Sequence, residues 1–136
     1  MNEALVRWLT AVTALAGAAI AGYLVYFRTT GSPIACTTGG CETVRESQYS
    51  ELLGVPVALL GVAAYLAIFG TCLARGELAR AAGAALALSS TAFGAWLLYV
   101  QLARIHAVCE WCLASDTAMT AVAILALLRI AVAEKY

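Results

Sequence analysis

The chain has 136 residues, of which 63% are hydrophobic and 12% are charged, and its eight basic and eight acidic side chains balance. A mean hydropathy of +0.88 and a charged fraction far below the roughly 25% of soluble domains exclude an ordinary soluble domain. The basic residues are scattered, which excludes a nucleic-acid-binding surface or a basic tail. The length fits a single domain over residues 1–136.

Four apolar stretches follow one another, each long enough to cross a bilayer core, which takes about 20 residues. They cover residues 8–27, 52–73, 78–102 and 108–132. Because lipid offers no partner for unpaired backbone groups, each should be a helix. The sequence therefore predicts an all-α integral membrane protein, a four-transmembrane-helix bundle with an outer loop at 28–51. The first stretch could instead be a cleaved signal peptide, but its apolar run exceeds the roughly 7–15 residues of such segments.

The distribution of basic residues predicts the orientation. An even number of spans puts both termini and the 74–77 turn on one side, which holds more basic residues than the other. These residues are Arg7, Arg75, Arg80, Arg129 and Lys135, against Arg28, Arg45 and Arg104. The bias favours cytoplasmic termini in the inner (plasma) membrane. The 28–51 loop and the start of the fourth span would then face an oxidising compartment, where disulfides persist.

A cysteine pair lies at the start of the fourth span. Cys109 and Cys112 are three residues apart, so they are neighbours on one helix face. A Cys-X-X-Cys pair at a helix start is typical of redox-active dithiols, because the helix dipole favours the thiolate. The alternative is a structural disulfide or two packed cysteines. The position at a membrane boundary favours redox chemistry.

A second pair, Cys36 and Cys41, lies in the 28–51 loop and encloses Gly39 and Gly40, which let the backbone turn sharply enough for the sulfurs to meet. Taken alone, this pair is equally a structural disulfide or a disulfide that an external thiol can attack. The presence of the other pair favours the functional interpretation. The fifth cysteine, Cys72, is expected to pack within the second span.

A metal site is the alternative use of the cysteines. His106 precedes the Cys-X-X-Cys motif by three residues, and the cysteine spacing does not by itself exclude zinc. An oxidising compartment argues against it, so we predict no metal.

Asp116 is a carboxyl within the fourth span, where insertion costs about 2.5–3.5 kcal/mol and indicates a function by default. It lies one turn beyond Cys112, about 6 Å deeper along the axis. If ionised, it would oppose thiolate formation at Cys112. If protonated, it would donate a hydrogen bond to a carbonyl-bearing ligand or supply a proton. The alternative is a packing role beside Ser89, Ser90 or Thr91 on the third span.

Several motifs occur in a fixed order: Cys-Thr-Thr-Gly-Gly-Cys at 36–41, Ser47, Leu-Gly-Val-Pro at 53–56 and Cys-Glu-Trp-Cys at 109–112, with shorter segments at 22–24 and 99–102. Together they resemble the bacterial vitamin K epoxide reductase homologues over nearly the whole chain. The resemblance implies a four-helix bundle that encloses a quinone, either ubiquinone or menaquinone. Such enzymes reoxidise a periplasmic thioredoxin-fold, DsbA-like partner that forms disulfides in secreted proteins.

By position, the resemblance makes Cys36 and Cys41 the loop shuttle pair. It makes Cys109 and Cys112 the active-site pair, with Cys112 nearest the quinone, and Ser47 matches the loop serine of the family. We therefore expect Cys112, Asp116 and Ser47 to contact the quinone.

Two departures from the family pattern matter. Many bacterial members continue into a fused thioredoxin-like domain, whereas this sequence ends at Tyr136, so we expect a separate partner. Vertebrate members carry a tyrosine four residues after the second cysteine of the motif, where this chain has Asp116; this favours a quinone over vitamin K epoxide. Three alternatives stay open: a reductase of vitamin K quinone or epoxide, a non-enzymatic bundle with structural disulfides, and a metal-binding or metal-transporting protein.

Overall fold

The computed structural model describes residues 2–30, 51–52, 55–106 and 110–135. Four long helices make up most of this part of the chain, and the last turn of one of them is π-helical. Two short antiparallel strands precede the second long helix. The elements are α1 (Glu3–Thr30), β1 (Glu51–Leu52), β2 (Val55–Pro56), α3 (Val57–Leu73), α4 (Glu77–Val100), the π-helical turn η2 (Gln101–Ile105) and α5 (Glu110–Lys135).

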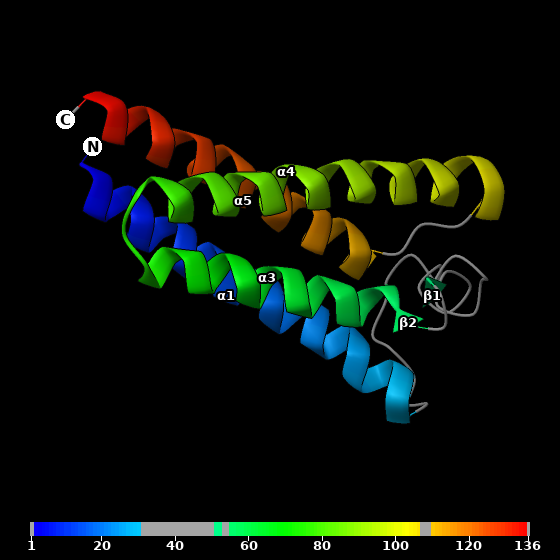
Figure 1. Cartoon of the computed structure of the whole chain (residues 1–136). Helices are drawn as coiled ribbons and strands as arrows, with labels where there is room; N and C mark the ends of the chain where they lie inside the picture. Colours follow the sequence, from blue (N-terminus) through cyan, green and yellow to red (C-terminus); the bar gives the residue numbers. More distant parts are fainter. Residues whose placement is uncertain (1, 31–50, 53–54, 107–109, 136) are drawn as a thin grey trace.

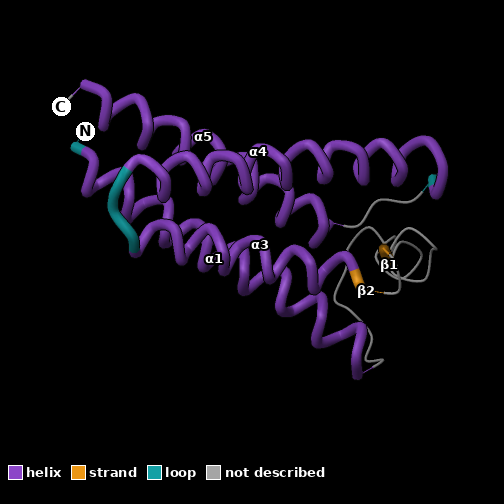
Figure 2. Tube along the Cα trace, in the orientation of Figure 1, coloured by secondary structure: helices purple, strands orange, loops and turns teal. Residues whose placement is uncertain are grey.

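The four helices form a ring. Helix α1 packs against α3 and α5, and α4 packs against the same two, so α3 and α5 lie diagonally opposite each other. The two termini and the α3–α4 turn lie at one end, which we call the termini end (Figure 1). The strands and the start of α5 lie at the other end (Figure 2). We call it the active-site end, after the prediction that the sequence makes for the Cys-X-X-Cys motif. The predicted all-α four-helix membrane bundle is confirmed.

The outside of the bundle suits lipid. Three helices contain stretches long and apolar enough to cross a membrane, namely Glu3–Tyr26, Glu77–Arg104 and Glu110–Ala133, and Val57–Leu73 is a shorter apolar helix. Large aliphatic side chains are exposed around the bundle, while the buried cluster is rich in alanine. Small buried residues let helices approach closely where hydrophobic burial does not drive their association.

Exposed aromatic residues lie near the ends of the apolar helices, where membrane boundaries are expected. On α1, the side chains of Trp8 and Tyr26 are 50% and 58% exposed. They are separated by about 27 Å along the helix axis, at 1.5 Å per residue, which is close to the roughly 30 Å of a hydrocarbon core. Trp96 and Tyr99 are likewise exposed near the active-site end of α4. Tryptophan and tyrosine concentrate at membrane–water interfaces because one end of the side chain is apolar and the other polar.

The helix boundaries differ from those expected. Helix α3 begins at Val57 rather than at residue 52, because Leu52 and Val55 pair as strands and Pro56 has no N–H to donate within a helix. Helix α1 continues to Thr30, into the expected loop. At the end of α4, the π-helical turn extends the helical path to residue 105. The left-handed backbone of His106 (φ 57°) then ends it, and its amide donates to the Gln101 carbonyl.

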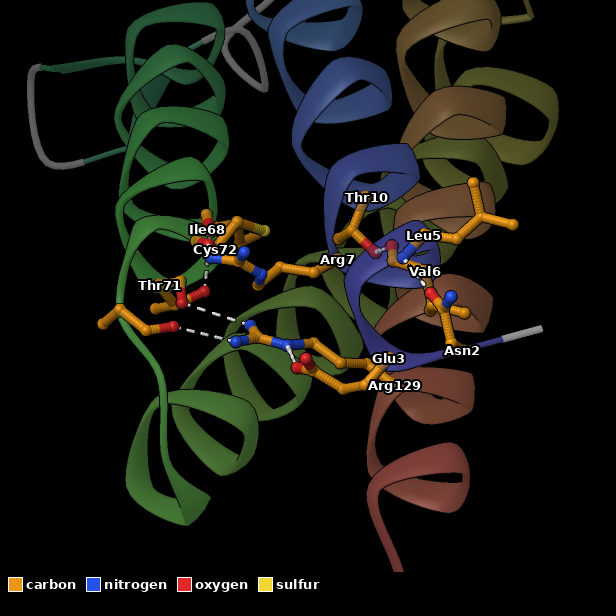
Figure 3. A network of polar contacts seen from close by, with 11 residues as sticks. Asn2, Glu3, Leu5, Val6, Arg7, Thr10, Ile68, Thr71, Cys72 and Arg129 are labelled. Atoms are coloured by element: carbon orange, nitrogen blue, oxygen red, sulfur yellow. Dashed lines mark hydrogen bonds and ion pairs between the residues drawn. The ribbon is translucent and has the colours of Figure 1, made fainter. Parts of the chain in front are cut away.

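A buried polar network joins three helices at the termini end (Figure 3). Arg129 of α5 is 2% exposed. Its guanidinium forms an ion pair with Glu3 of α1 at 3.0 Å and donates to the carbonyls of Thr71 and Ala74 at 3.1 and 2.9 Å. Those carbonyls lie at the C-terminal end of α3, where helix carbonyls lack intrahelical partners. The network therefore satisfies the end of α3 and attaches it to α1 and, across the bundle, to α5.

A second arginine contributes from α1. Arg7 is 6% exposed and donates from Nη1 to the Cys72 carbonyl at 3.2 Å, while its guanidinium lies over the Trp8 ring at 5.0 Å. Cys72 itself is 1% exposed, in keeping with the expected packing role.

Candidate functional site

Four of the predicted site residues lie outside the described residues: Cys36, Cys41, Ser47 and Cys109. The structure therefore locates Cys112 and Asp116, together with the side chains that surround them.

Cys112 lies in the first turn of α5, at the active-site end of the bundle (Figure 1). Its side chain is half-buried. The N-terminal end of a helix favours negative charge, because the amides of its first turn have no helical partners. The Cys112 sulfur is thus placed where a thiolate is stabilised and where the bundle meets the membrane boundary.

An aromatic contact joins this turn to α1. The rings of Trp111 and Tyr23 have centroids 4.6 Å apart and are inclined by 37°. Trp111 belongs to the Cys-Glu-Trp-Cys motif, and Tyr23 belongs to the short Gly-Tyr-Leu segment of α1. Two motifs far apart in the sequence are therefore in contact beside Cys112.

Asp116 lies one turn deeper and is half-buried, with its carboxyl directed at the backbone of α4. A Cβ atom added to Gly94 would lie 2.8 Å from Asp116 Oδ1 and 3.2 Å from Cγ. The carboxyl therefore occupies space that only a glycine leaves open.

The sequence left open a packing role for Asp116 beside Ser89, Ser90 or Thr91. The Thr91 hydroxyl donates to the Ala87 carbonyl at 2.8 Å and approaches the Met119 carbonyl at 3.5 Å. Among the described residues, no hydrogen bond joins the hydroxyls of Ser89, Ser90 or Thr91 to the Asp116 carboxyl. The neighbour of the carboxyl is Gly94, about one turn further along α4 than those residues.

Sequence reasoning missed Tyr65 of α3. It is 1% exposed, its ring lies against Gly17 of α1, and its hydroxyl donates to the Ser115 carbonyl of α5. The sequence did contain a signal for this residue, because a tyrosine in an otherwise apolar span needs a hydrogen-bond partner for its hydroxyl. The sequence did not show which partner this would be.

These residues form one level of the bundle, to which all four helices contribute. We call it the Tyr65–Asp116 layer and define it as Gly17, Tyr65, Gly94, Ser115 and Asp116. It lies one helical turn, about 5–6 Å, below Cys112. The arrangement places a thiol near the membrane boundary and a carboxyl beneath it, inside an apolar bundle.

The side chains around Cys112 and Asp116 bear on which ligand the bundle could hold. Within the described part of the chain, no three His, Cys, Asp or Glu side chains gather closely enough to hold a metal ion. A quinone needs an apolar surrounding, a nearby thiolate and a polar group for its carbonyl oxygens. Cys112 and Asp116 provide the thiolate and the polar group on one helix.

A comparison with known families covers most of the chain. The sequence matches the family model described as "VKOR: Vitamin K epoxide reductase family" over residues 8–127, which includes α3, α4, most of α1 and α5, and both cysteine motifs. A quinone takes part in the redox chemistry of this family. The chain therefore belongs to the vitamin K epoxide reductase family and is a membrane-embedded oxidoreductase.

Proposed function

We propose that the protein is a quinone-dependent thiol–disulfide oxidoreductase of the inner membrane. It reoxidises a separate periplasmic, thioredoxin-fold, DsbA-like partner and so supports disulfide formation. The observation that carries the proposal is the position of Cys112 in the first turn of an apolar helix, with the Asp116 carboxyl one turn deeper against Gly94.

The cysteines transfer electrons by successive thiol–disulfide exchanges. A thiolate of the partner attacks Cys36 of the Cys36–Cys41 disulfide, and release of the partner as its own disulfide leaves the loop pair reduced. Cys41 then attacks Cys109 in the Cys109–Cys112 disulfide, and Cys112 leaves as a thiolate. Resolution by Cys36 restores the loop disulfide. Each exchange needs an accessible sulfur and a good leaving thiol, and the helix start stabilises the Cys112 thiolate.

A bound quinone, ubiquinone or menaquinone, supplies the acceptor for two electrons and two protons. Cys112, Asp116 and Ser47 are the residues that would hold it. Within the described part of the chain, no hydrogen bond engages the carboxyl oxygens of Asp116, so this group has donor or acceptor capacity left for a ligand. Re-formation of the Cys109–Cys112 disulfide completes the cycle.

The direction of electron flow follows from redox potentials. A strongly oxidising, DsbA-like partner has a potential near −120 mV, and about 30 mV corresponds to 1.4 kcal/mol for a two-electron step. The terminal acceptor must therefore have a similar or higher potential, or be reoxidised continuously by respiration.

The proposed orientation puts both termini in the cytoplasm and the four active cysteines at the outer face. It is supported by the excess of basic residues on the side of the termini. The termini and the α3–α4 turn lie together at the end opposite Cys112 (Figure 1).

The decisive experiment is quinone reduction by the purified protein in detergent, driven by a reduced DsbA-like partner. We expect turnover by the wild type and by Cys72→Ala, because Cys72 is buried at the termini end, and none by Cys112→Ala. Absence of turnover with either quinone, while both disulfides persist under mild reductant, would refute the proposal and leave a non-enzymatic bundle with structural disulfides.

The family match makes reduction of vitamin K quinone or its epoxide the alternative activity. Vitamin K epoxide consumption driven by dithiothreitol, compared with ubiquinone and menaquinone reduction in the same preparation, separates the two. Metal analysis of that preparation tests the metal-binding alternative, which requires stoichiometric zinc or copper.

A further inference from the structure

Tyr65 is the largest fully buried side chain in the described part of the chain. It projects from α3, which packs against α1 and α4 but lies diagonally across the bundle from α5. Its hydroxyl nevertheless reaches α5. Tyr65 therefore links α3 to α5, the diagonally opposite helix, although α1 and α4 lie between the backbones of these two helices.

The contact is made with the backbone of α5. The Tyr65 hydroxyl donates to the Ser115 carbonyl and lies 3.2 Å from the Ser115 hydroxyl. In a regular helix, the Ser115 carbonyl and the Met119 amide bond to each other, because they are four residues apart. The phenol therefore joins the hydrogen-bond ladder of α5 at one defined turn, which sets the height and rotation of that turn relative to α3.

The opposite side of the ring is closed by α1. A Cβ atom on Gly17 would lie only 2.2, 2.4 and 2.7 Å from atoms of the Tyr65 ring. The ring therefore lies directly on the α1 backbone and has no room to move away from α5. The Tyr65 ring is confined by α1 on one side and hydrogen-bonded to α5 on the other. The position of the ring therefore determines the position of the α5 backbone at Ser115.

The turn held in this way is the one that carries the proposed quinone contacts. Ser115 is three residues after Cys112 and lies on the same helix face, about 4.5 Å deeper, and Asp116 is the next residue. The Asp116 carboxyl is at the same time directed at Gly94, so a rotation of this turn moves it relative to α4.

We propose that Tyr65 is a positioning residue of the quinone site. Through the Ser115 carbonyl, it sets the orientation of the α5 turn that presents Cys112 and Asp116. This inference rests on the proposed function. It assigns no chemical step to the phenol, which stays bonded to the backbone.

Tyr65→Phe tests the inference, because it keeps the ring that fills the space beside Gly17 and removes only the hydroxyl. Loss of one buried hydrogen bond corresponds to about a three- to tenfold change in an equilibrium. We expect the quinone dissociation constant, measured by quenching of tryptophan fluorescence in the absence of the partner, to rise by about this factor. The quinone KM should rise with it, while the KM for the DsbA-like partner stays unchanged.

The matched control is Tyr99→Phe, which removes an equivalent hydroxyl from a side chain that is 56% exposed on α4. It should leave both quinone parameters unchanged. Ser115→Ala, which removes the second hydroxyl contact but keeps the carbonyl, should raise the quinone dissociation constant in the same direction by a smaller factor. If Tyr65→Phe does not fold in detergent, Ser115→Ala decides the question.

The outcomes separate this inference from the proposed function. The positioning role would be overturned if the wild type is active and both Tyr65→Phe and Ser115→Ala keep the wild-type quinone affinity and quinone KM. This holds even if the unfolding temperatures of the two variants fall. A wild type that neither binds nor reduces a quinone would instead refute the proposed function, and the positioning role with it. A selective rise in the quinone parameters would establish the positioning role.

Discussion

Replacing Arg129 with methionine would remove the guanidinium that joins α5, α1 and α3 at the termini end while keeping a long side chain in its place. Arg129 is 2% exposed and makes three hydrogen bonds, one to the Glu3 carboxylate at 3.0 Å and two to carbonyls at the end of α3. The variant leaves these three partners without their donor. We therefore expect the bundle to lose stability and to keep its fold.

The magnitude follows from these contacts. Interhelical hydrogen bonds in a membrane protein average about 0.6 kcal/mol each, so three of them set a lower value near 2 kcal/mol. Removing one partner of a buried charge pair costs about 3–5 kcal/mol in soluble proteins. The Glu3 side chain is 29% exposed and can turn towards solvent, so the cost should lie between the value from the hydrogen bonds and the lower end of the value for a buried charge pair. We expect a loss of about 2–3 kcal/mol in the free energy of unfolding.

The assay is reversible unfolding by sodium dodecyl sulfate in mixed micelles, followed by far-ultraviolet circular dichroism. Arg104→Met is the matched control, because Arg104 is exposed at the active-site end; it should change stability by less than about 0.5 kcal/mol. Arg129→Lys should lie between the wild type and Arg129→Met, because an ammonium keeps the charge but lacks the planar geometry that reaches three acceptors.

A loss for Arg129→Met as small as that for Arg104→Met would refute the reasoning, since the network would then contribute no net stability. The kcat for quinone reduction should stay unchanged in Arg129→Met. Cys112 lies about 25 Å along α5 from Arg129, at 1.5 Å per residue, and no contact of the network reaches the Tyr65–Asp116 layer.

Two further predictions concern the glycines of the Tyr65–Asp116 layer. Gly94→Ala should leave the free energy of unfolding nearly unchanged, because the flexible Asp116 carboxyl can move away from the new Cβ. We expect it to weaken quinone binding, and Asp116→Asn to do the same; unchanged quinone affinity in both variants would exclude a role for the carboxyl at the quinone ring. Gly17→Ala should cost about 1–3 kcal/mol of stability in the same detergent unfolding assay, because the new Cβ collides with the rigid Tyr65 ring; a stability equal to that of the wild type would show that the ring is not confined there.

The sequence determined the helices of this protein because a bilayer permits few alternatives. An apolar stretch of about 20 residues must satisfy its backbone hydrogen bonds internally, so four such stretches predict four helices without any knowledge of their packing. The position of Cys112 at a helix start could likewise be predicted from the sequence, because it depends only on where an apolar segment begins.

The tertiary structure decided how the helices are rotated and offset relative to one another. The sequence left open a packing role for Asp116 beside Ser89, Ser90 or Thr91, whereas the structure directs its carboxyl at Gly94, because the offset between α4 and α5 depends on how small side chains let them approach.

Tyr65 illustrates the same limit, since its partner is a backbone carbonyl that carries no sequence signature. Arg129 does so too, since two of its three partners are carbonyls at the end of α3. The periodicity and length of apolar segments are local properties of a chain. The partners of a buried polar group depend on where other helices place their backbones, and only packing determines that.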